Sequence, residues 1–387
     1  MVHVRHMQKP WIVIVEPDAD AKLLINRTQP CTLRWAVSVW RYMSIFHARS
    51  GSSRALQGGT IRYCSISVAA LTLLLSVGGQ SASPSQTSSA GNVLNTERLT
   101  LPSFADLAAG PRSPTEAESC CSAADMKVYE RARTDTRFEM LRVTYTSDGL
   151  PVVAFIYKPS AAGEKRPVVV YNRGSYVRQN AARELLVTFH RLADAGFLVV
   201  APMYRGSEGA PGRDEMGGAE LADLMNIRPV IASLPYADAA SLFLYGESRG
   251  GMMTLQALRD GFPTRAAAIV GVFTDLEQYV KEDPKAAALG PQLFPDYETN
   301  RAAIIERRSA VRWPERITAP LLIMHGGDDT SVNPVHALQL AGAMQRSGKR
   351  YELVIAAGAR HVLEPFEAER DERAIRWFRR YLAGERQ

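Results

Sequence analysis

The sequence predicts an α/β fold in which a doubly wound, mostly parallel β-sheet follows an N-terminal antiparallel hairpin. Three observations support this. After residue 139, short segments that are almost continuously apolar alternate with longer segments whose apolar residues recur at helical spacing. Strands that are apolar throughout are buried on both faces, so helices must cover both sides of the sheet. The first two strand-like segments, 141–146 and 152–157, are joined by Ser147-Asp148-Gly149, which is typical of a hairpin turn.

The remaining elements are expected in alternating order. Further strands are expected at 168–171, 197–200, 242–245, 267–270, 321–324 and 351–355. Helices are expected at 184–195, 221–234, 252–259, 335–344 and 366–382, with a variable helical section at 276–313. The catalytic domain is expected to span 126–387, which is long enough to bury one sizeable core.

Charge separates the start of the chain from the rest. The chain has 387 residues and a formal net charge of +6. Residues 1–82 contain nine Lys or Arg against three acidic residues, whereas the remainder contains 37 of each. The body of the protein therefore has no general attraction for a polyanion, and no nucleic-acid partner is expected.

A short apolar run at 66–77 has the layout of a signal-peptide core. It follows Arg62 and precedes small residues that include Gly79-Gln80-Ser81, and its 12 residues are too few to cross a bilayer. We expect a signal peptide at 61–82, a secreted or periplasmic protein (alternatively a cytoplasmic one), and no stable membrane span. Because signal peptides normally begin a chain, residues 1–60 are expected to be a mis-assigned or non-functional extension.

Between the signal peptide and the domain, residues 83–125 are rich in Ser, Thr, Pro and Ala and are expected to form a linker or N-terminal arm. The four cysteines are Cys31, Cys64, Cys120 and Cys121. Their spacing matches neither a disulfide framework nor a metal site, since adjacent cysteines pair poorly. We expect no disulfide, no metal and no cofactor.

A nucleophile is expected where the strand 242–245 ends. Gly246-Glu247-Ser248-Arg249-Gly250 fits the G-x-S-x-G pattern and lies between an apolar strand and a helix-compatible segment. The glycines let strand and helix pass closely, and the sharp turn exposes the Ser248 hydroxyl. The Arg249 amide then lies at a helix N-terminus, directed at negative charge that forms beside this hydroxyl. The alternative is an ordinary glycine-rich connection between a strand and a helix.

A serine needs a base and an acid to become a nucleophile near neutral pH. Four histidines follow the expected arm: His190, His325, His336 and His361. In parallel sheets, reactive groups gather beyond the carboxyl ends of the strands, and His361 lies in the loop after the last strand. Packing, a turn and a helix start account for the others. The acid is expected in the loop after strand 321–324, where Asp328 and Asp329 compete and the chemistry of the sequence does not separate them. The chain order Ser, Asp, His is that of α/β-hydrolases.

The region 141–382 resembles the catalytic domain of the prolyl oligopeptidase family of serine peptidases, in particular bacterial members without a β-propeller. The motifs that carry the resemblance are Y-N-R-G-S (171–175), Y-R-G-S-E-G-A-P-G-R-D-E-M-G-G-A-E-L-A-D (204–223), G-E-S-R-G-G-M-M (246–253), H-G-G-D-D-T-S-V (325–332) and G-A-R-H (358–361). The resemblance implies that Asp329 is the acid. It also implies an oxyanion hole made by the Arg249 amide and a second donor, often a tyrosine hydroxyl in the family. Here that donor would be the backbone or side chain of Arg173, or Asn172.

The resemblance implies a serine peptidase that cleaves peptide or amide bonds through an acyl-enzyme, using Ser248, His361 and Asp329. The elbow and triad alone would serve a carboxylic ester hydrolase equally well. A non-catalytic binding protein with an α/β-hydrolase fold is the alternative from another class, and the three filled triad positions disfavour it. A peptide or small ester is therefore the expected partner. The segment 204–223 is expected to be mainly structural, through ion pairs of its charged residues.

Overall fold

The computed structural model describes residues 12–15, 24–25, 90–104, 106, 123–161, 163–175, 181–294 and 297–384. The strands of this part of the chain are β1 Ile12–Val15, β2 Leu24–Ile25, β3 Val93–Leu99, β4 Phe138–Ser147, β5 Leu150–Pro159, β6 Arg166–Asn172, β7 Leu198–Pro202, β8 Ala237–Glu247, β9 Ala266–Val270, β10 Leu321–Gly326 and β11 Tyr351–Ala356. The helices are α3 Ala123–Thr134, α4 Ala181–Asp194, α5 Leu221–Met225, α6 Ile227–Ser233, α7 Arg249–Arg259, α8 Leu276–Glu282, α9 Pro284–Leu293, α10 Tyr297–Arg308, α11 Val335–Arg346 and α12 Glu367–Leu382, with 3-10 turns η1 Ala310–Arg312, η2 Pro314–Arg316 and η3 His361–Leu363.

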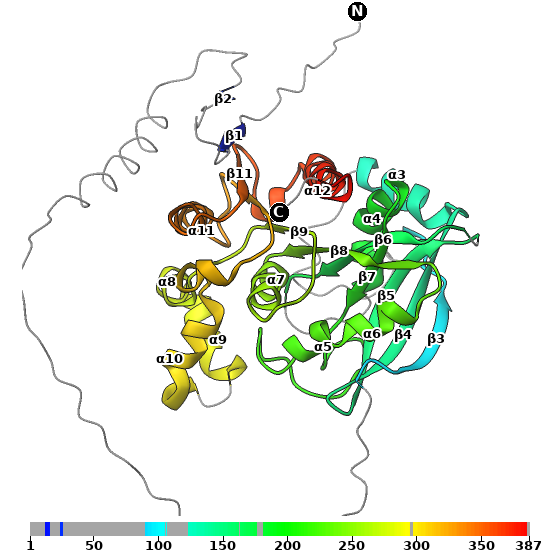
Figure 1. Ribbon diagram of the computed structural model, residues 1–387, viewed down its shortest axis with the longest axis horizontal. Coiled ribbons are helices and arrows are strands. Elements are labelled where there is room, and N and C mark those ends of the chain that lie inside the picture. The colour runs from blue at the N-terminus through cyan, green and yellow to red at the C-terminus, as the bar shows by residue number, and fades with distance from the viewer. Residues whose placement is uncertain are drawn as a thin grey trace, which may run out of the picture. The chain divides into compact units, whose positions relative to one another are not determined.

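These strands form one sheet in the order β2-β1-β11-β10-β9-β8-β6-β7-β5-β4-β3 (Figure 1). The six strands from β11 to β7 in this order run parallel to one another. β4 and β5 form the expected antiparallel hairpin, and β5 pairs antiparallel with β7. Asp148 and Gly149 make the hairpin turn with φ values of 48° and 78°. The predicted fold class, a doubly wound and mostly parallel sheet that opens with a hairpin, is confirmed.

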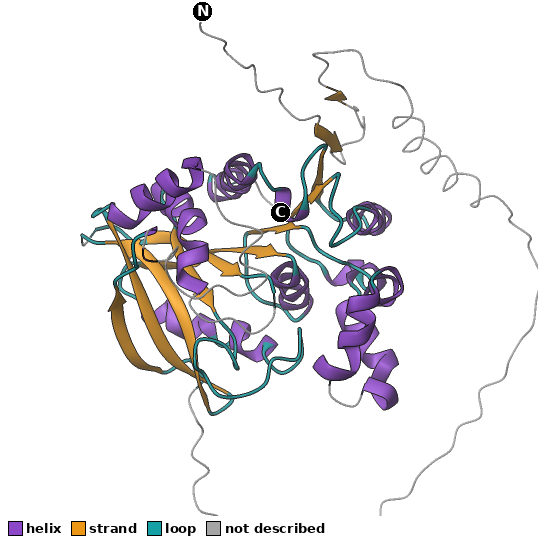
Figure 2. Cartoon of the chain, turned by 180° about the vertical axis from the view of Figure 1, so that it is seen from behind, coloured by secondary structure: helices purple, strands orange, loops and turns teal. Residues whose placement is uncertain are grey.

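Helices cover both faces of the sheet (Figure 2). Successive residues of a strand point to opposite faces, and β6 shows this directly. Val168 and Val170 lie in the core layer under α5, α6, α7 and α11, whereas Val169 and Tyr171 lie in the layer under α3, α4 and α12. Because each strand feeds both layers, its sequence is apolar at every position, which is the pattern that predicted it.

Part of the expected linker or N-terminal arm forms a β-strand. β3 lies within 83–125 and pairs antiparallel with β4 at the edge of the sheet, with Arg98 opposite Leu141. All of its residues are exposed except Leu99, so no apolar alternation marks this strand in the sequence. Within the expected extension 1–60, β1 pairs antiparallel with β11. The predicted signal peptide at 61–82 and the four cysteines lie outside the described residues. Within those residues, no helix combines the length and apolar character needed to cross a bilayer.

Candidate active site

Three loops meet at the carboxyl-terminal edge of the parallel strands. Ser248 follows β8, Asp329 follows β10, and His361 follows β11. β8, β9, β10 and β11 are consecutive neighbours in the sheet and run parallel, so their carboxyl ends lie at the same edge. Ser248 and Asp329 are 81 positions apart in the sequence, and Asp329 and His361 are 32 positions apart, yet all three reach the same edge of the sheet.

Ser248 lies in a strained turn between β8 and α7. Its φ of 49° and ψ of −123° are unusual for a residue with a side chain, and its amide donates a hydrogen bond of 2.8 Å to the Val270 carbonyl. The glycines on either side are required by space. A Cβ at Gly246 would overlap the Thr254 hydroxyl, and a Cβ at Gly250 would overlap the Asn172 carbonyl oxygen. The turn therefore needs the glycine spacing that the sequence shows.

A continuous chain of hydrogen bonds joins the three expected residues. The Ser248 Oγ lies 3.0 Å from His361 Nε2, and His361 Nδ1 lies 2.8 Å from Asp329 Oδ2. An ionised carboxylate only accepts, so Nδ1 carries the proton that is donated to Asp329. His361 Nε2 is then free to accept the hydroxyl proton of Ser248. This is the geometry that a general base needs.

The Asp329 carboxylate is buried and fully hydrogen-bonded, with its side chain 0% exposed. Oδ1 accepts bonds of 2.9 Å from the amides of Ser331 and Val332, and Oδ2 accepts from His361. Burial alone would raise the pKa of Asp329, but hydrogen bonds from His325 and His361 and the Val332 amide hold it well below its usual range. Asp329 thus stays ionised at neutral pH.

Of the two neighbouring aspartates, only Asp329 takes part in this chain of hydrogen bonds. Asp328 is exposed, and its amide donates a hydrogen bond of 2.9 Å to the Ala359 carbonyl. The structure therefore separates two residues that the chemistry of the sequence could not.

The candidate oxyanion donors have separate environments. The Arg249 amide opens α7, directly after Ser248. The Asn172 side chain is buried, and its Nδ2 donates to the Thr254 hydroxyl at 2.8 Å. The Arg173 guanidinium donates to the Met203 carbonyl at 2.7 Å.

The backbone near Arg173 nevertheless passes close to the nucleophile. A Cβ at Gly174 would lie 3.2 Å from the Ser248 Cβ, a distance that real Cβ contacts rarely reach. Because the side chains of Asn172 and Arg173 are committed to other partners, the backbone of this segment is the group that adjoins Ser248.

The segment 204–223 packs beneath the site through buried ion pairs. Arg249, which is 2% exposed, pairs with Asp214 at 2.6 Å and with Glu220 at 2.7 Å. Arg205 pairs with Asp223 at 2.6 Å. The segment is therefore tied both to α7 and to itself, as expected for a structural role.

Arg370 was not expected from the sequence. It lies on α12, pairs with Glu247 at 2.7 Å and donates to the Val362 carbonyl at 3.2 Å. One guanidinium thus connects the residue before Ser248 with the residue after His361. In the sequence, Arg370 is one of several charged residues of an amphipathic helix, and no local signal distinguishes it.

The three other histidines lie elsewhere. His190, on α4, is 2.8 Å from Asp135. His336, on α11, accepts from the Thr274 amide at 3.3 Å, and burial lowers the pKa of His336 to about 4. His325, at the end of β10, lies beside Asp329. In the sequence, His325 stands out only through its place in H-G-G-D-D, where the two glycines predict a turn.

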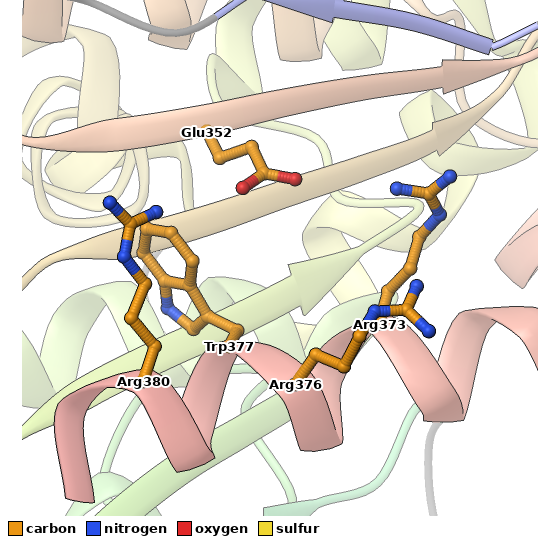
Figure 3. A pocket seen from close by; sticks show the side chains of 5 residues that line it. All are labelled: Glu352, Arg373, Arg376, Trp377 and Arg380. Atoms are coloured by element: carbon orange, nitrogen blue, oxygen red, sulfur yellow. The ribbon is translucent and has the colours of Figure 1, made fainter. Parts of the chain in front are cut away.

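A separate small cavity lies between β11 and α12 (Figure 3). The side chain of Glu352 reaches it from β11, and those of Arg373, Arg376, Trp377 and Arg380 reach it from α12. None of the three hydrogen-bonded residues above lines this cavity. Among the residues that the structure describes, no group of three or more His, Cys, Asp or Glu side chains could hold a metal ion.

Comparison with known proteins places the same region in a known group. The model of the prolyl oligopeptidase family matches residues 185–385. The uncharacterized peptidase YtmA of Bacillus subtilis is 24% identical over 232 residues, which cover 59% of this chain and 88% of that protein.

Solved structures agree on the fold. A puromycin-hydrolyzing peptidase of Mycobacterium tuberculosis matches 60% of this chain and 37% of its own, with 24% identity and a TM-score of 0.52. The acylaminoacyl peptidase of Pyrococcus horikoshii matches 65% and 43%, with 19% identity and a TM-score of 0.57. The acetyl xylan esterase of Paenibacillus sp. R4 matches 63% and 85%, with 18% identity and a TM-score of 0.52. This chain thus spans less than half of the two peptidase structures and most of the esterase.

Proposed function

The chain belongs to the prolyl oligopeptidase family, and from this premise we propose that it is a serine peptidase that cleaves peptide or amide bonds through an acyl-enzyme on Ser248. The observation that carries the proposal is the hydrogen-bond chain from Ser248 through His361 to Asp329, with distances of 3.0 Å and 2.8 Å. The three residues act as a catalytic triad.

In the first half of the reaction, the Ser248 Oγ attacks the substrate carbonyl while its proton passes to His361 Nε2. Asp329 stabilises the imidazolium that results. The carbonyl π electrons move onto oxygen, where the Arg249 amide and the backbone near Arg173 stabilise the negative charge. The intermediate then collapses, the carbon–nitrogen bond breaks, and His361 returns its proton to the leaving amine.

In the second half, water attacks the acyl-enzyme and gives one proton to His361. Collapse of the second intermediate releases the acid product and returns that proton to Ser248. Every step uses side chains and backbone of this chain together with water.

An ester hydrolase that uses the same triad is the second candidate. The structural similarity to acetyl xylan esterase, which extends over 85% of that protein, supports it. The same apparatus opens both bonds, and the shape of the pocket and the protonation of the leaving group decide between them.

The two candidates are separated by kcat/KM on a short peptide anilide and on an aryl ester of matched acyl group. The peptidase proposal predicts turnover of both, with loss of both in Ser248→Ala. Ester turnover with no detectable anilide turnover would favour the esterase. A folded protein without either activity would favour a non-catalytic binding protein with an α/β-hydrolase fold.

We further propose that the protein is exported to the periplasm or the medium through the signal peptide at 61–82. The apolar core at 66–77 and the small residues after it support this. N-terminal sequencing of exported protein should start near residue 82, and a mature chain that retains Trp11 or Trp35 would contradict the proposal.

A further inference from the structure

We propose that His325 is a positioning residue that holds the Asp329 carboxylate in place through a second imidazole hydrogen bond. This inference rests on the proposed function, in which Asp329 orients His361. It assigns a role to a histidine that the mechanism above does not use.

The ring of His325 contacts two residues of the loop that follows β10, Asp329 and Val332. Its Nε2 is 2.9 Å from the Val332 carbonyl oxygen and 3.2 Å from Asp329 Oδ2. The His325 side chain is 1% exposed and the Asp329 side chain 0% exposed, so water does not compete for these contacts.

These contacts fix the tautomer of His325. A carbonyl oxygen and a carboxylate oxygen only accept hydrogen bonds, so the proton must be on Nε2. One N–H is therefore shared between Val332 and Asp329. The Val332 amide also donates to Asp329 Oδ1 at 2.9 Å. Val332 therefore contacts both partners: its amide donates to Asp329, and its carbonyl accepts from His325.

Polar groups surround both oxygens of the carboxylate. Oδ1 accepts from the amides of Ser331 and Val332, Oδ2 accepts from His361, and His325 Nε2 lies 3.2 Å from Oδ2. With these positions occupied, rotation of the buried carboxylate would break several bonds. His325 thereby keeps Oδ2 directed at His361. Its N–H also partly neutralises the charge of the Asp329 carboxylate, so the carboxylate attracts the His361 imidazolium less strongly.

Other charged groups lie near this pair and near His361. Arg370 on α12 donates to the Val362 carbonyl, next to His361, and pairs with Glu247. His336 on α11 is close enough to interact electrostatically with His325, and Glu282 on α8 lies 3.5 Å from His336 Nε2. Near His361, the Arg360–Glu364 ion pair is on the surface, with Arg360 69% exposed. Asp328 is exposed to solvent. The direct contact with His325 is therefore the interaction to test.

The test compares His325→Gln with His325→Met, because these side chains have equal length and only Gln keeps a donor. We expect kcat of His325→Met to fall about 10- to 100-fold, the usual effect of losing a hydrogen bond to a charged group. KM should stay unchanged, since His325 does not contact substrate. The acid limb of kcat/KM should move to higher pH by about half a unit, because the less neutralised carboxylate favours the protonated base. His325→Gln should keep both properties close to wild type.

His190→Met is the control, because His190 also pairs with an aspartate, Asp135, but has no contact with the triad. It should change stability without moving the pH profile. Equal losses in the Gln and Met variants, or an acid limb that does not move in the Met variant, would overturn the proposal.

If only the Gln variant folds, its kcat and pH profile decide. A kcat within about threefold of wild type supports the positioning role of His325, and a fall in kcat as large as that expected of His325→Met contradicts it. Wild-type protein that shows no turnover would instead refute the proposed function.

Discussion

Replacing Arg249 by methionine tests whether the buried ion pairs beneath the nucleophile stabilise the fold. The guanidinium is 2% exposed, and its partners Asp214 and Glu220 are 2% and 0% exposed. Arg249→Met keeps the backbone amide after Ser248 and roughly the volume of the side chain, but removes the cation that pairs directly with both buried carboxylates. Arg308 still interacts electrostatically with Glu220.

The expected loss of unfolding free energy depends on the hydrogen bonds that the two carboxylates keep in the variant. Removing one partner of a buried ion pair costs about 3–5 kcal/mol. Asp214 keeps a bond from the Met216 amide, and Glu220 keeps bonds from the amides of Glu215, Gly217 and Gly218. These amides limit the cost, so we expect one such loss of about 3–5 kcal/mol rather than two.

The loss should depend on pH. Burial favours a higher pKa for Glu220, but the charge of Arg249 and the Gly217 amide lower it below its usual value. A lowered carboxyl pKa contributes stability above the unfolded value of 4.5 that disappears as pH falls through the folded value. Without Arg249 this contribution is lost, so wild type and variant should differ most near neutral pH and converge in acid.

Urea unfolding followed by circular dichroism at about pH 7 and at about pH 3.5, below the unfolded value of 4.5, measures this. Arg376→Met is the control, because its pair with Glu372 is on the surface, with side chains 54% and 66% exposed. The control should leave the midpoint unchanged. A loss in Arg249→Met no larger than in the control, or a loss that grows as pH falls, would refute the reasoning.

Three further predictions concern the site and its surroundings. Asp329→Asn should lower kcat on the order of 10⁴-fold with the fold retained, and a loss below about tenfold in a hydrolysis assay would contradict the role of the acid. Burial lowers the pKa of His336 to about 4 from 6.5, so the unfolded chain binds a proton in this range that the folded chain does not. Stability is therefore complete above about pH 6.5 and falls toward pH 4 by up to about 3 kcal/mol, and urea unfolding of His336→Gln should lack that part of the pH dependence; an unchanged dependence would exclude His336 as its source. Gly174→Ala should slow fluorophosphonate labelling about tenfold or more, because the new Cβ would lie 3.2 Å from the Ser248 Cβ and 3.3 Å from the Glu247 carbonyl oxygen; labelling at the wild-type rate would show that the backbone gives way without cost.

The sequence predicted the elements that are buried on both sides. β6 and β8 are apolar at their central positions because each faces two core layers, so their pattern is strong and local. The same holds for the residues around Ser248, where the close approach of strand and helix admits only glycine at Gly246 and Gly250.

Other features depend on contacts that no local pattern encodes. β3 is an exposed edge strand, so no buried face imposed an alternation on it. Arg370 pairs with Glu247, which is distant in sequence, and the ring of His325 contacts the Asp329 carboxylate. Composition marks neither residue. The side chains of Asn172 and Arg173 bond to Thr254 and Met203, whereas the backbone that passes close to Ser248 is that of Gly174, a distinction that requires coordinates.

The most direct test of the account is covalent labelling of folded protein by a fluorophosphonate, followed by mass spectrometry of the labelled peptide. The account predicts a single adduct on Ser248, no adduct in Ser248→Ala, and labelling slowed by about 10³-fold or more in His361→Ala. Folded wild-type protein that stays unlabelled, or that carries the label on another serine, would contradict it.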